Sequence, residues 1–125
     1  AEMPGKSAAA IAKQWKKNLG IDVAVEKVDL MTLLRSGSDG DYQMMFTGWS
    51  HDYYDAMTYL EMFAAKDKLR NASYQSREFS GFMNGIGKEK DRLKRVDLLK
   101  KAEKKLVSDA AIAPVYFKYS KAAVK

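Results

Sequence analysis

Apolar side chains in residues 7–19 recur at intervals of three and four positions, with lysines on the opposite side of the pattern. This period predicts an amphipathic helix. Ser7 is its expected N-cap, and Gly20 is expected to end it. In residues 21–28 the pattern changes, because apolar and charged side chains alternate there. Strict alternation predicts a β-strand.

Asp29 is the expected N-cap of a short helix over residues 30–34. Residues 36–41, with the sequence SGSDGD, have the small and Asx residues of a turn. The mostly apolar run 42–48 is short enough for a buried strand. A strand, a helix and a strand in this order predict a βαβ unit, in which the two strands are parallel.

Further elements are expected after residue 48. Asp55 and Ser76 are expected to cap two helices, with breaks at Gly85 and Gly87 ending the second. A long helix then contains the basic run 88–105, and the chain is expected to finish with a strand over residues 111–119. The predicted fold class is therefore α/β, with a small mixed, mostly parallel sheet flanked by helices.

Composition limits what this fold can do. The 125 residues suit one packed domain rather than two ordinary ones. The absence of cysteine removes disulfides, thiolate nucleophiles and cysteine-based zinc sites. No stretch approaches the roughly 18 consecutive apolar residues that a membrane helix needs. A single histidine makes a poor transition-metal site, so no metal and no cofactor are expected.

The formal net charge of +6 is concentrated in one part of the chain. The run 88–105 holds nine basic and four acidic residues. Interleaved acids and the lack of aromatic residues favour a solvated helix face. The alternative hypothesis is a small basic interaction domain that binds nucleic acid or anionic lipid through this run.

Acidic and aromatic residues gather in a different region. Residues 36–65 contain five acidic residues and no Lys or Arg, and seven aromatic residues lie between positions 42 and 63. Ligands of open α/β sheets bind beyond the carboxyl ends of strands, which is where the loop after residue 48 is expected. Carboxylates there favour an ammonium group, and flat rings supply apolar contact area. Trp49 and Asp52 are the leading candidates, whereas Phe46 has the pattern of a core residue.

Catalysis is not expected. Ser50, His51 and Asp52 are the residue types of a triad, but consecutive side chains project in different directions. His51 is interpreted as a solvated residue or one at the rim of a ligand site. Because no nucleophile, base and oxyanion donor can be assembled, the chain is predicted to be a binding module and not an enzyme.

Four blocks of sequence occur in a characteristic order: WKKNLGIDV (15–23), GDYQMMFTGWSHDYYDAMTYLEMF (40–63), NASYQSREF (71–79) and KKAEKKLVSDAAIAPVYFKYSKAAVK (100–125). Together they resemble the carboxyl-terminal lobe of the oligopeptide- and dipeptide-binding proteins of ABC importers, which form extracellular solute-binding protein family 5. The most specific element is GW followed, after two residues, by DY.

The resemblance implies that residues 1–125 are a single partial domain, a periplasmic-binding-protein-like lobe fragment. The intact receptor would be extracytoplasmic, in the periplasm or as a cell-surface lipoprotein. It would close on an oligopeptide or dipeptide between this lobe and the remaining lobe, and deliver it to an ABC permease.

The resemblance also implies roles for individual residues. Asp52 falls on the carboxylate that pairs with the α-amino group of the peptide, and Trp49 falls on a ring that lines the cleft. Tyr53, His51 and Phe46 complete the expected ligand-binding set. Phe46 and His51 occupy positions that vary with the ligand, so nickel, sugar and pheromone-peptide ligands stay open.

Two expectations follow for the chain by itself. One lobe leaves half of a peptide exposed to water, so we expect weak or absent peptide binding. Unpaired edges of the predicted sheet favour a homodimer or strand exchange between copies.

Overall fold

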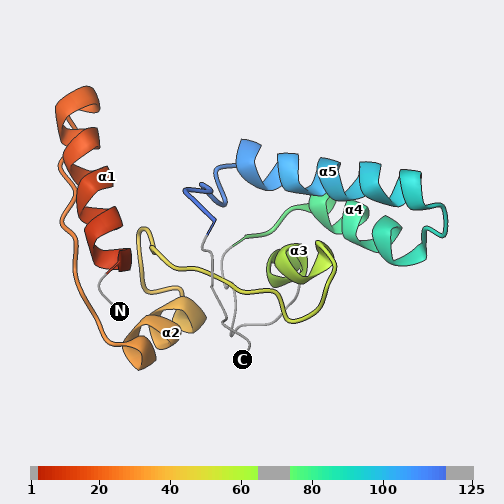
Figure 1. The fold of residues 1–125 in the computed structure, drawn as a ribbon, viewed down its shortest axis with the longest axis horizontal. Helices are drawn as coiled ribbons and strands as arrows, with labels where there is room; N and C mark the ends of the chain where they lie inside the picture. Colours follow the sequence, from red (N-terminus) through yellow and green to blue (C-terminus); the bar gives the residue numbers. More distant parts are fainter. Residues whose placement is uncertain (1–2, 65–73, 118–125) are drawn as a thin grey trace, which may run out of the picture. The chain divides into compact units, whose positions relative to one another are not determined.

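The structure is a computed structural model that describes residues 3–64 and 74–117. These residues contain the helices α1 (Met3–Leu19), α2 (Leu30–Asp39), α3 (Met57–Ala64), α4 (Arg77–Lys88) and α5 (Arg92–Ser108) (Figure 1). The chain divides into two compact units, Ala1–Gln75 and Ser76–Lys125. The single partial domain stays a prediction.

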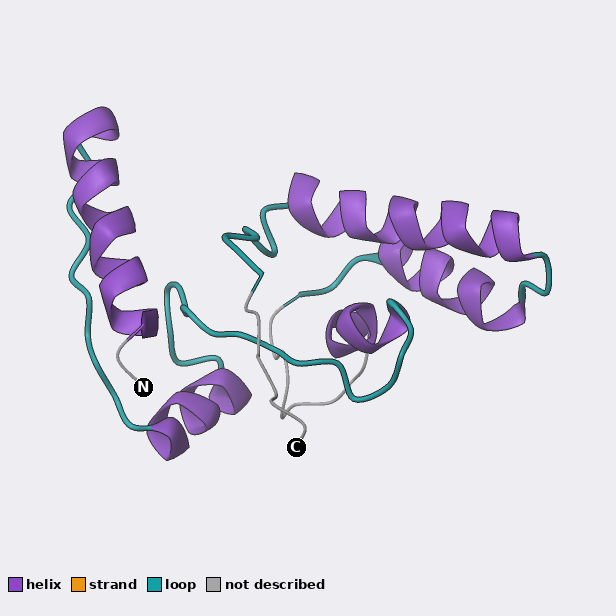
Figure 2. Cartoon of the chain, viewed as in Figure 1, coloured by secondary structure: helices purple, strands orange, loops and turns teal. Residues whose placement is uncertain are grey.

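No β-strand is formed within residues 3–64 and 74–117 (Figure 2). The segments predicted as strands have no regular secondary structure at 21–28, 42–48 and 112–117. The predicted mixed, mostly parallel sheet is therefore wrong for the described residues, and so is the α/β class that rested on it. An alternating pattern fixes which side of a strand is apolar, but a strand exists only where a neighbour accepts its backbone hydrogen bonds. Residues 118 and 119, the end of the last predicted strand, lie outside the described residues.

In the first unit, α1 confirms the predicted amphipathic helix and extends it toward the N-terminus. The helix begins at Met3, so Ser7 lies inside it and the predicted cap at Ser7 is wrong. Gly20 ends the helix as predicted, with a φ of 70° that glycine adopts without steric cost.

The chain after Gly20 runs back along α1 (Figure 1). Lys16 Nζ lies 2.7 Å from Asp22 Oδ1. A Cβ built on Gly5 would lie 3.2 Å from Lys27 Cε, so the far end of this segment also contacts the helix. Among the described residues, residues 21–28 therefore have a helix beside them but no strand.

Helix α2 starts at the predicted cap and is longer than predicted. Asp29 Oδ1 accepts hydrogen bonds from the backbone N–H groups of Met31 and Thr32, at 2.9 and 3.0 Å. The helix continues to Asp39, through most of the segment predicted as a turn. The chain turns at Gly40, where φ is 72° and the backbone N–H bonds to the Ser36 carbonyl.

In the second unit, α4 and α5 pack side by side as a helical hairpin (Figure 1). Ser76 Oγ caps α4 by accepting a hydrogen bond from the Phe79 N–H at 3.2 Å, as predicted. The buried apolar residues of this unit come from both helices: Phe79, Met83, Ile86, Ala102 and Leu106. Their spacing of three and four residues places them along one stripe of each helix.

Gly85 and Gly87 do not break α4, which continues to Lys88. A Cβ at Gly85 would lie 3.3 Å from Leu98 Cδ1 of α5. The missing side chain thus allows the two helices to approach closely. The predicted break was wrong because packing against α5 stabilises a helix that glycine alone disfavours.

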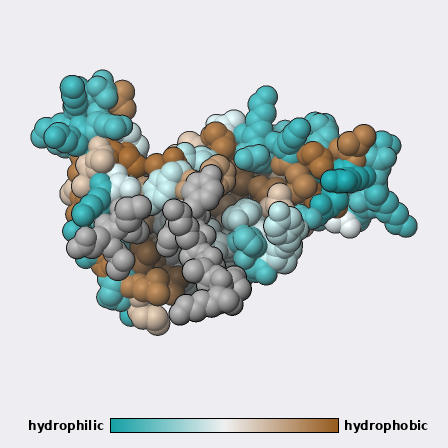
Figure 3. Space-filling view, in the orientation of Figure 1, coloured by the Kyte–Doolittle hydropathy of each residue, from teal (hydrophilic) through white to brown (hydrophobic). Residues whose placement is uncertain are grey.

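The apolar pattern of α5 is only partly buried. Ala102 and Leu106 are fully buried, whereas Leu93 is 80% exposed and Val96 is 39% exposed. Figure 3 shows apolar atoms exposed among hydrophilic ones along this helix.

Candidate functional site

The loop of residues 49–55, called the 49–55 loop below, is attached to α3 by hydrogen bonds. The Asp52 backbone N–H donates to Thr58 Oγ1 at 3.1 Å, and Thr58 is fully buried. The Tyr53 hydroxyl donates to Glu61 Oε2 at 2.9 Å. These bonds fix the backbone of the loop relative to the first two turns of the helix.

Asp55 ends the loop and starts α3. Its Oδ1 accepts a hydrogen bond from the Met57 N–H at 2.8 Å, and its carbonyl accepts one from the Thr58 N–H at 3.2 Å. This is the cap that the sequence predicts at Asp55. A carboxylate at the start of a helix is also favoured by the helix dipole.

A shallow hollow of about 240 Å³ lies beside the loop, lined by His51, Tyr53, Tyr54, Asp55, Ala56 and Tyr59. The rings of His51 and Tyr54 meet edge to face, with centroids 6.2 Å apart. The Tyr59 hydroxyl lies 3.5 Å from His51 Nδ1. Its described lining therefore presents aromatic surface together with His51 and Asp55, and includes no Lys or Arg.

The structure places the five predicted ligand-binding residues in two groups. His51 and Tyr53 line the hollow, and Tyr53 is 42% exposed. Trp49 is 40% exposed, Asp52 is exposed and Phe46 is half-buried, but none of these three lines it. Their role as ligand contacts stays a prediction, and the exposure leaves the indole and the carboxylate accessible on the first unit.

Sequence reasoning missed Thr58, the residue that holds the backbone of the 49–55 loop. Its buried hydroxyl has a structural partner in the Asp52 N–H. No sequence motif distinguishes this threonine from a threonine on a solvated helix face. Its hydrogen bond to the loop exists only after the loop has folded back onto α3. Tyr54 and Tyr59 could have been found as part of the aromatic cluster.

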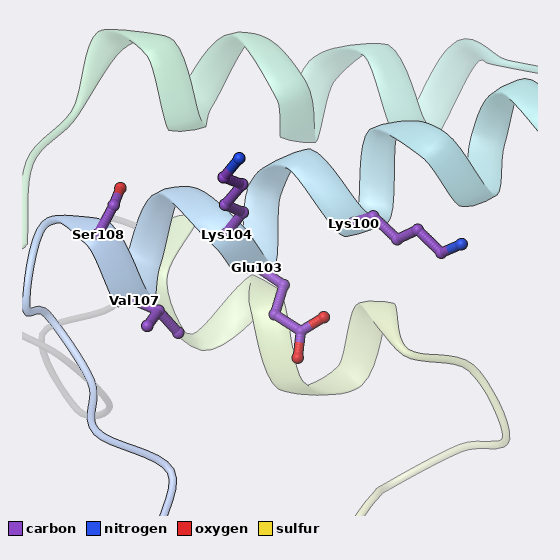
Figure 4. Close-up of a pocket in the computed structure, with 5 residues that line it drawn as sticks. All are labelled: Lys100, Glu103, Lys104, Val107 and Ser108. Atoms are coloured by element: carbon purple, nitrogen blue, oxygen red, sulfur yellow. The ribbon is translucent and has the colours of Figure 1, made fainter.

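A larger hollow of about 460 Å³ lies on α5 and is lined by Lys100, Glu103, Lys104, Val107 and Ser108. These residues lie on one face of a single helix by their spacing. Figure 4 shows the side chains of Lys100, Glu103 and Lys104 pointing in different directions. A ligand site needs groups that converge, so this hollow is a space between long side chains on a helix surface.

At least two lysines of the basic run 88–105 form ion pairs within the second unit. Lys101 Nζ lies 2.6 Å from Asp97 Oδ2. Lys105 Nζ lies 2.8 Å from Asp109 Oδ1 and 3.2 Å from Glu78 Oε2. Hydrogen bonds to Asp109 and then to Glu78 raise the pKa of Lys105. Asp97 within the run, and Glu78 and Asp109 outside it, thus reduce the positive potential that a polyanion would meet.

Two features are absent from the described residues. Within residues 3–64 and 74–117, no helix has the length and apolar character needed to cross a bilayer. In the same part of the chain, no three His, Asp or Glu side chains form a group suited to a metal ion.

Comparison with known protein families identifies the group to which these features belong. Residues 2–71 match the family described as bacterial extracellular solute-binding proteins, family 5 Middle. The chain belongs to this family.

Relatives within solute-binding protein family 5 include peptide-binding proteins. Oligopeptide-binding protein OppA of Bacillus subtilis is 35% identical over 113 residues, which are 90% of this chain and 21% of the relative. Periplasmic oligopeptide-binding protein OppA of Salmonella typhimurium is 34% identical over 112 residues, with the same coverage. This chain therefore spans about a fifth of the length of the relatives it matches.

Solved structures of periplasmic binding proteins share the fold. The unliganded open form of the murein tripeptide-binding protein MppA matches with a TM-score of 0.81 and 25% identity, over 88% of this chain and 21% of that one. A periplasmic oligopeptide-binding protein from Borrelia burgdorferi, OppAIV, matches with a TM-score of 0.76 and 36% identity, over 82% and 21%. The resemblance inferred from four sequence blocks is thereby confirmed. It favours a fragment of a solute-binding protein over the basic interaction domain.

Proposed function

We propose that residues 1–125 are part of the ligand-binding lobe of a peptide receptor that serves an ABC importer, and that the 49–55 loop contacts the amino terminus of the peptide. The supporting observation is the coincidence of family membership with an exposed carboxylate and an exposed indole on one loop. Relatives that match most of this chain carry the names of oligopeptide-binding proteins.

The chemistry of the loop suits a peptide ammonium group. Residues 36–65 contain five acidic residues and no Lys or Arg, so the formal charge of that stretch is negative. A charge-assisted hydrogen bond between a carboxylate and an ammonium group is about twice as strong as a neutral one. Trp49, with 40% of its surface exposed, offers apolar area beside that charge.

The other predicted contacts have subsidiary roles in this proposal. Tyr53 and His51 line the aromatic hollow and would contact ligand side chains, while half-buried Phe46 would support the strand-like segment before the loop. Binding is the whole function of the chain, and no reaction is involved. A remaining lobe of the same protein, an ABC permease and an extracytoplasmic location, periplasmic or as a lipoprotein, belong to the same proposal.

The test uses a chimeric receptor in which this chain replaces the aligned segment of OppA from Bacillus subtilis. Its affinity for tetra-alanine is measured by isothermal titration calorimetry. Asp52→Asn leaves an enclosed ammonium group without its partner, which costs about 2 kcal/mol or more, so we expect affinity to fall about 30-fold. Trp49→Ala should cost about tenfold through lost aromatic contact.

Two controls isolate the charge. Asp41→Asn removes an exposed acid outside the 49–55 loop and should leave affinity unchanged. N-acetylated tetra-alanine has no ammonium group, so Asp52→Asn should not weaken its binding further. If Asp52→Asn weakens the free and the acetylated peptide equally, the role proposed for Asp52 is wrong.

A further inference from the structure

Thr58 is a buried polar residue at the start of α3, and in the described part of the chain no other polar residue is buried to this extent. Removing a hydroxyl from water costs free energy unless the hydroxyl finds a hydrogen-bond partner. Here the partner is the Asp52 backbone N–H, which donates to Thr58 Oγ1 at 3.1 Å. A valine would fill the same space without that cost. The hydroxyl at this position therefore indicates a role in holding the 49–55 loop.

The bond to Thr58 orients the backbone on one side of Asp52. Because a peptide unit is planar, fixing the Asp52 N–H fixes the peptide unit that precedes the Asp52 Cα atom. Further along the loop, the Tyr53 carbonyl accepts a hydrogen bond from the Asp55 N–H at 2.9 Å, which orients the peptide unit after Tyr53. The backbone is thus held on both sides of residues 52 and 53. Backbone dihedral angles in turn limit the rotamers that the Asp52 side chain can adopt.

Thr58 is itself held in place by the helix. It is the second residue of α3, and its own N–H donates to the Asp55 carbonyl at 3.2 Å. Branching at Cβ restricts the χ1 angle of a threonine in a helix to two main rotamers. Groups on a helix keep a defined position better than groups on a loop do. Through Thr58, the loop residue Asp52 is therefore positioned by a helix.

The other side-chain hydrogen bond between the loop and α3 is more easily replaced. The Tyr53 hydroxyl donates to Glu61 Oε2 at 2.9 Å, but this bond is exposed. Water can replace either partner there, so loss of the bond leaves no buried group unsatisfied. Loss of the Thr58 hydroxyl would instead leave the Asp52 N–H against an apolar group unless the loop moved. The position of Asp52 therefore depends on Thr58 more than on Glu61.

We propose that Thr58 is a positioning residue for recognition of the peptide amino terminus, because its hydroxyl holds the Asp52 backbone where the carboxylate meets the ammonium group. This inference rests on the proposed function and extends it to a buried residue that acts through Asp52 rather than by contact with the ligand. A hydrogen bond weakens as its distance and angle depart from the optimum, so a displaced carboxylate gains less from the ammonium group. The contribution of Thr58 to affinity should therefore appear only for ligands with a free amino terminus.

The chimeric receptor tests this inference with Thr58→Val, which keeps the branching of the side chain and removes the hydroxyl. We expect affinity for tetra-alanine, measured by isothermal titration calorimetry, to fall about tenfold. Affinity for N-acetylated tetra-alanine should stay within about twofold of the original. Thr58→Ser keeps the hydroxyl and should bind tetra-alanine within about threefold of the original affinity. Thr32→Val removes an exposed hydroxyl from α2 and is the matched control, for which both affinities should be unchanged.

A measurement without peptide examines the hydrogen bond itself. In a chimera labelled on its aspartate nitrogens, the amide signal of Asp52 is identified by its loss in Asp52→Asn. Thr58→Val should speed hydrogen exchange of this amide about tenfold or more, and Thr58→Ser should not. Circular dichroism establishes that the variants keep their helices.

A double-mutant cycle with Asp52→Asn separates failure of this inference from failure of the proposed function. If Asp52→Asn weakens only the free peptide while Thr58→Val weakens both peptides equally, Thr58 merely stabilises the fold and the inference is wrong. It is also wrong if Thr58→Val weakens tetra-alanine by the same factor with and without Asp52→Asn. Equal weakening of both peptides by Asp52→Asn is a separate outcome, in which the role proposed for Asp52 fails and the role of Thr58 in recognition fails with it.

Discussion

At the scale of single residues, Asp29 makes the stability of the start of α2 depend on pH. Hydrogen bonds from the backbone N–H of Thr32 and then from its hydroxyl lower the pKa of Asp29 below its ordinary value of 3.8. A carboxylate whose folded pKa is lowered stabilises the fold above its unfolded pKa, and this contribution is lost as pH falls through the folded pKa. We therefore expect the start of α2 to lose helical structure as pH falls below 3.8. Amide chemical shifts of Met31 and Thr32 measure it.

Asp29→Asn is the control for this pH dependence. Asparagine is also a favoured N-cap, but its side chain does not titrate. The variant should keep the start of α2 and show little change in those two amides over the same pH range. An Asp29 carboxyl that titrates at or above its ordinary pKa would contradict the prediction.

At the scale of elements, the stability of the α4–α5 hairpin depends on a short buried stripe. Ile86 is 1% exposed and belongs to this stripe. Replacing a buried Ile with Ala removes apolar contacts and leaves a cavity, which costs about 2–5 kcal/mol. Ile86→Ala should lower the free energy of unfolding by that amount in urea denaturation. Val96→Ala, at a site 39% exposed, should cost less than about 1 kcal/mol.

If Val96→Ala destabilised the chain as much as Ile86→Ala, the buried stripe would not be the basis of the hairpin's stability. In that case the exposed part of α5 would have to be covered in solution.

Helices were easier to predict than strands, for a physical reason. The caps at Asp29, Asp55 and Ser76 act within three residues, so the sequence itself contains their partners. The pattern of residues 21–28 predicted a strand, but none forms there in the described part of the chain. A strand needs a neighbour that accepts its backbone hydrogen bonds, and a local pattern does not contain that neighbour. Gly85 shows the opposite case, in which a contact with Leu98 of α5 overrides the helix-breaking tendency of glycine.

The candidate site could also be predicted only in part from the sequence. Composition located the acidic and aromatic loop, and the family motif selected Trp49 and Asp52 within it. Neither could locate the Thr58 hydroxyl, because a buried hydrogen bond across six residues is set by how the loop folds onto α3. The exposure of Trp49 likewise required coordinates.

At the scale of the whole molecule, the chain's length relative to its relatives bears on binding. It spans 21% of OppA from Bacillus subtilis. The 49–55 loop is exposed on the first unit, and the aromatic hollow beside it is shallow. A peptide bound there would keep much of its backbone in water. Its contacts would then have to offset the loss of translational and rotational freedom with only part of the usual buried surface.

We therefore expect the isolated chain to bind short peptides at least a hundredfold more weakly than the chimeric receptor, which corresponds to about 2.7 kcal/mol. Calorimetry with tetra-alanine at micromolar chain concentration should show no saturable heat, while the chimera saturates. Micromolar binding by the isolated chain would mean that one loop with Trp49 and Asp52 suffices, and that enclosure between two lobes contributes little affinity.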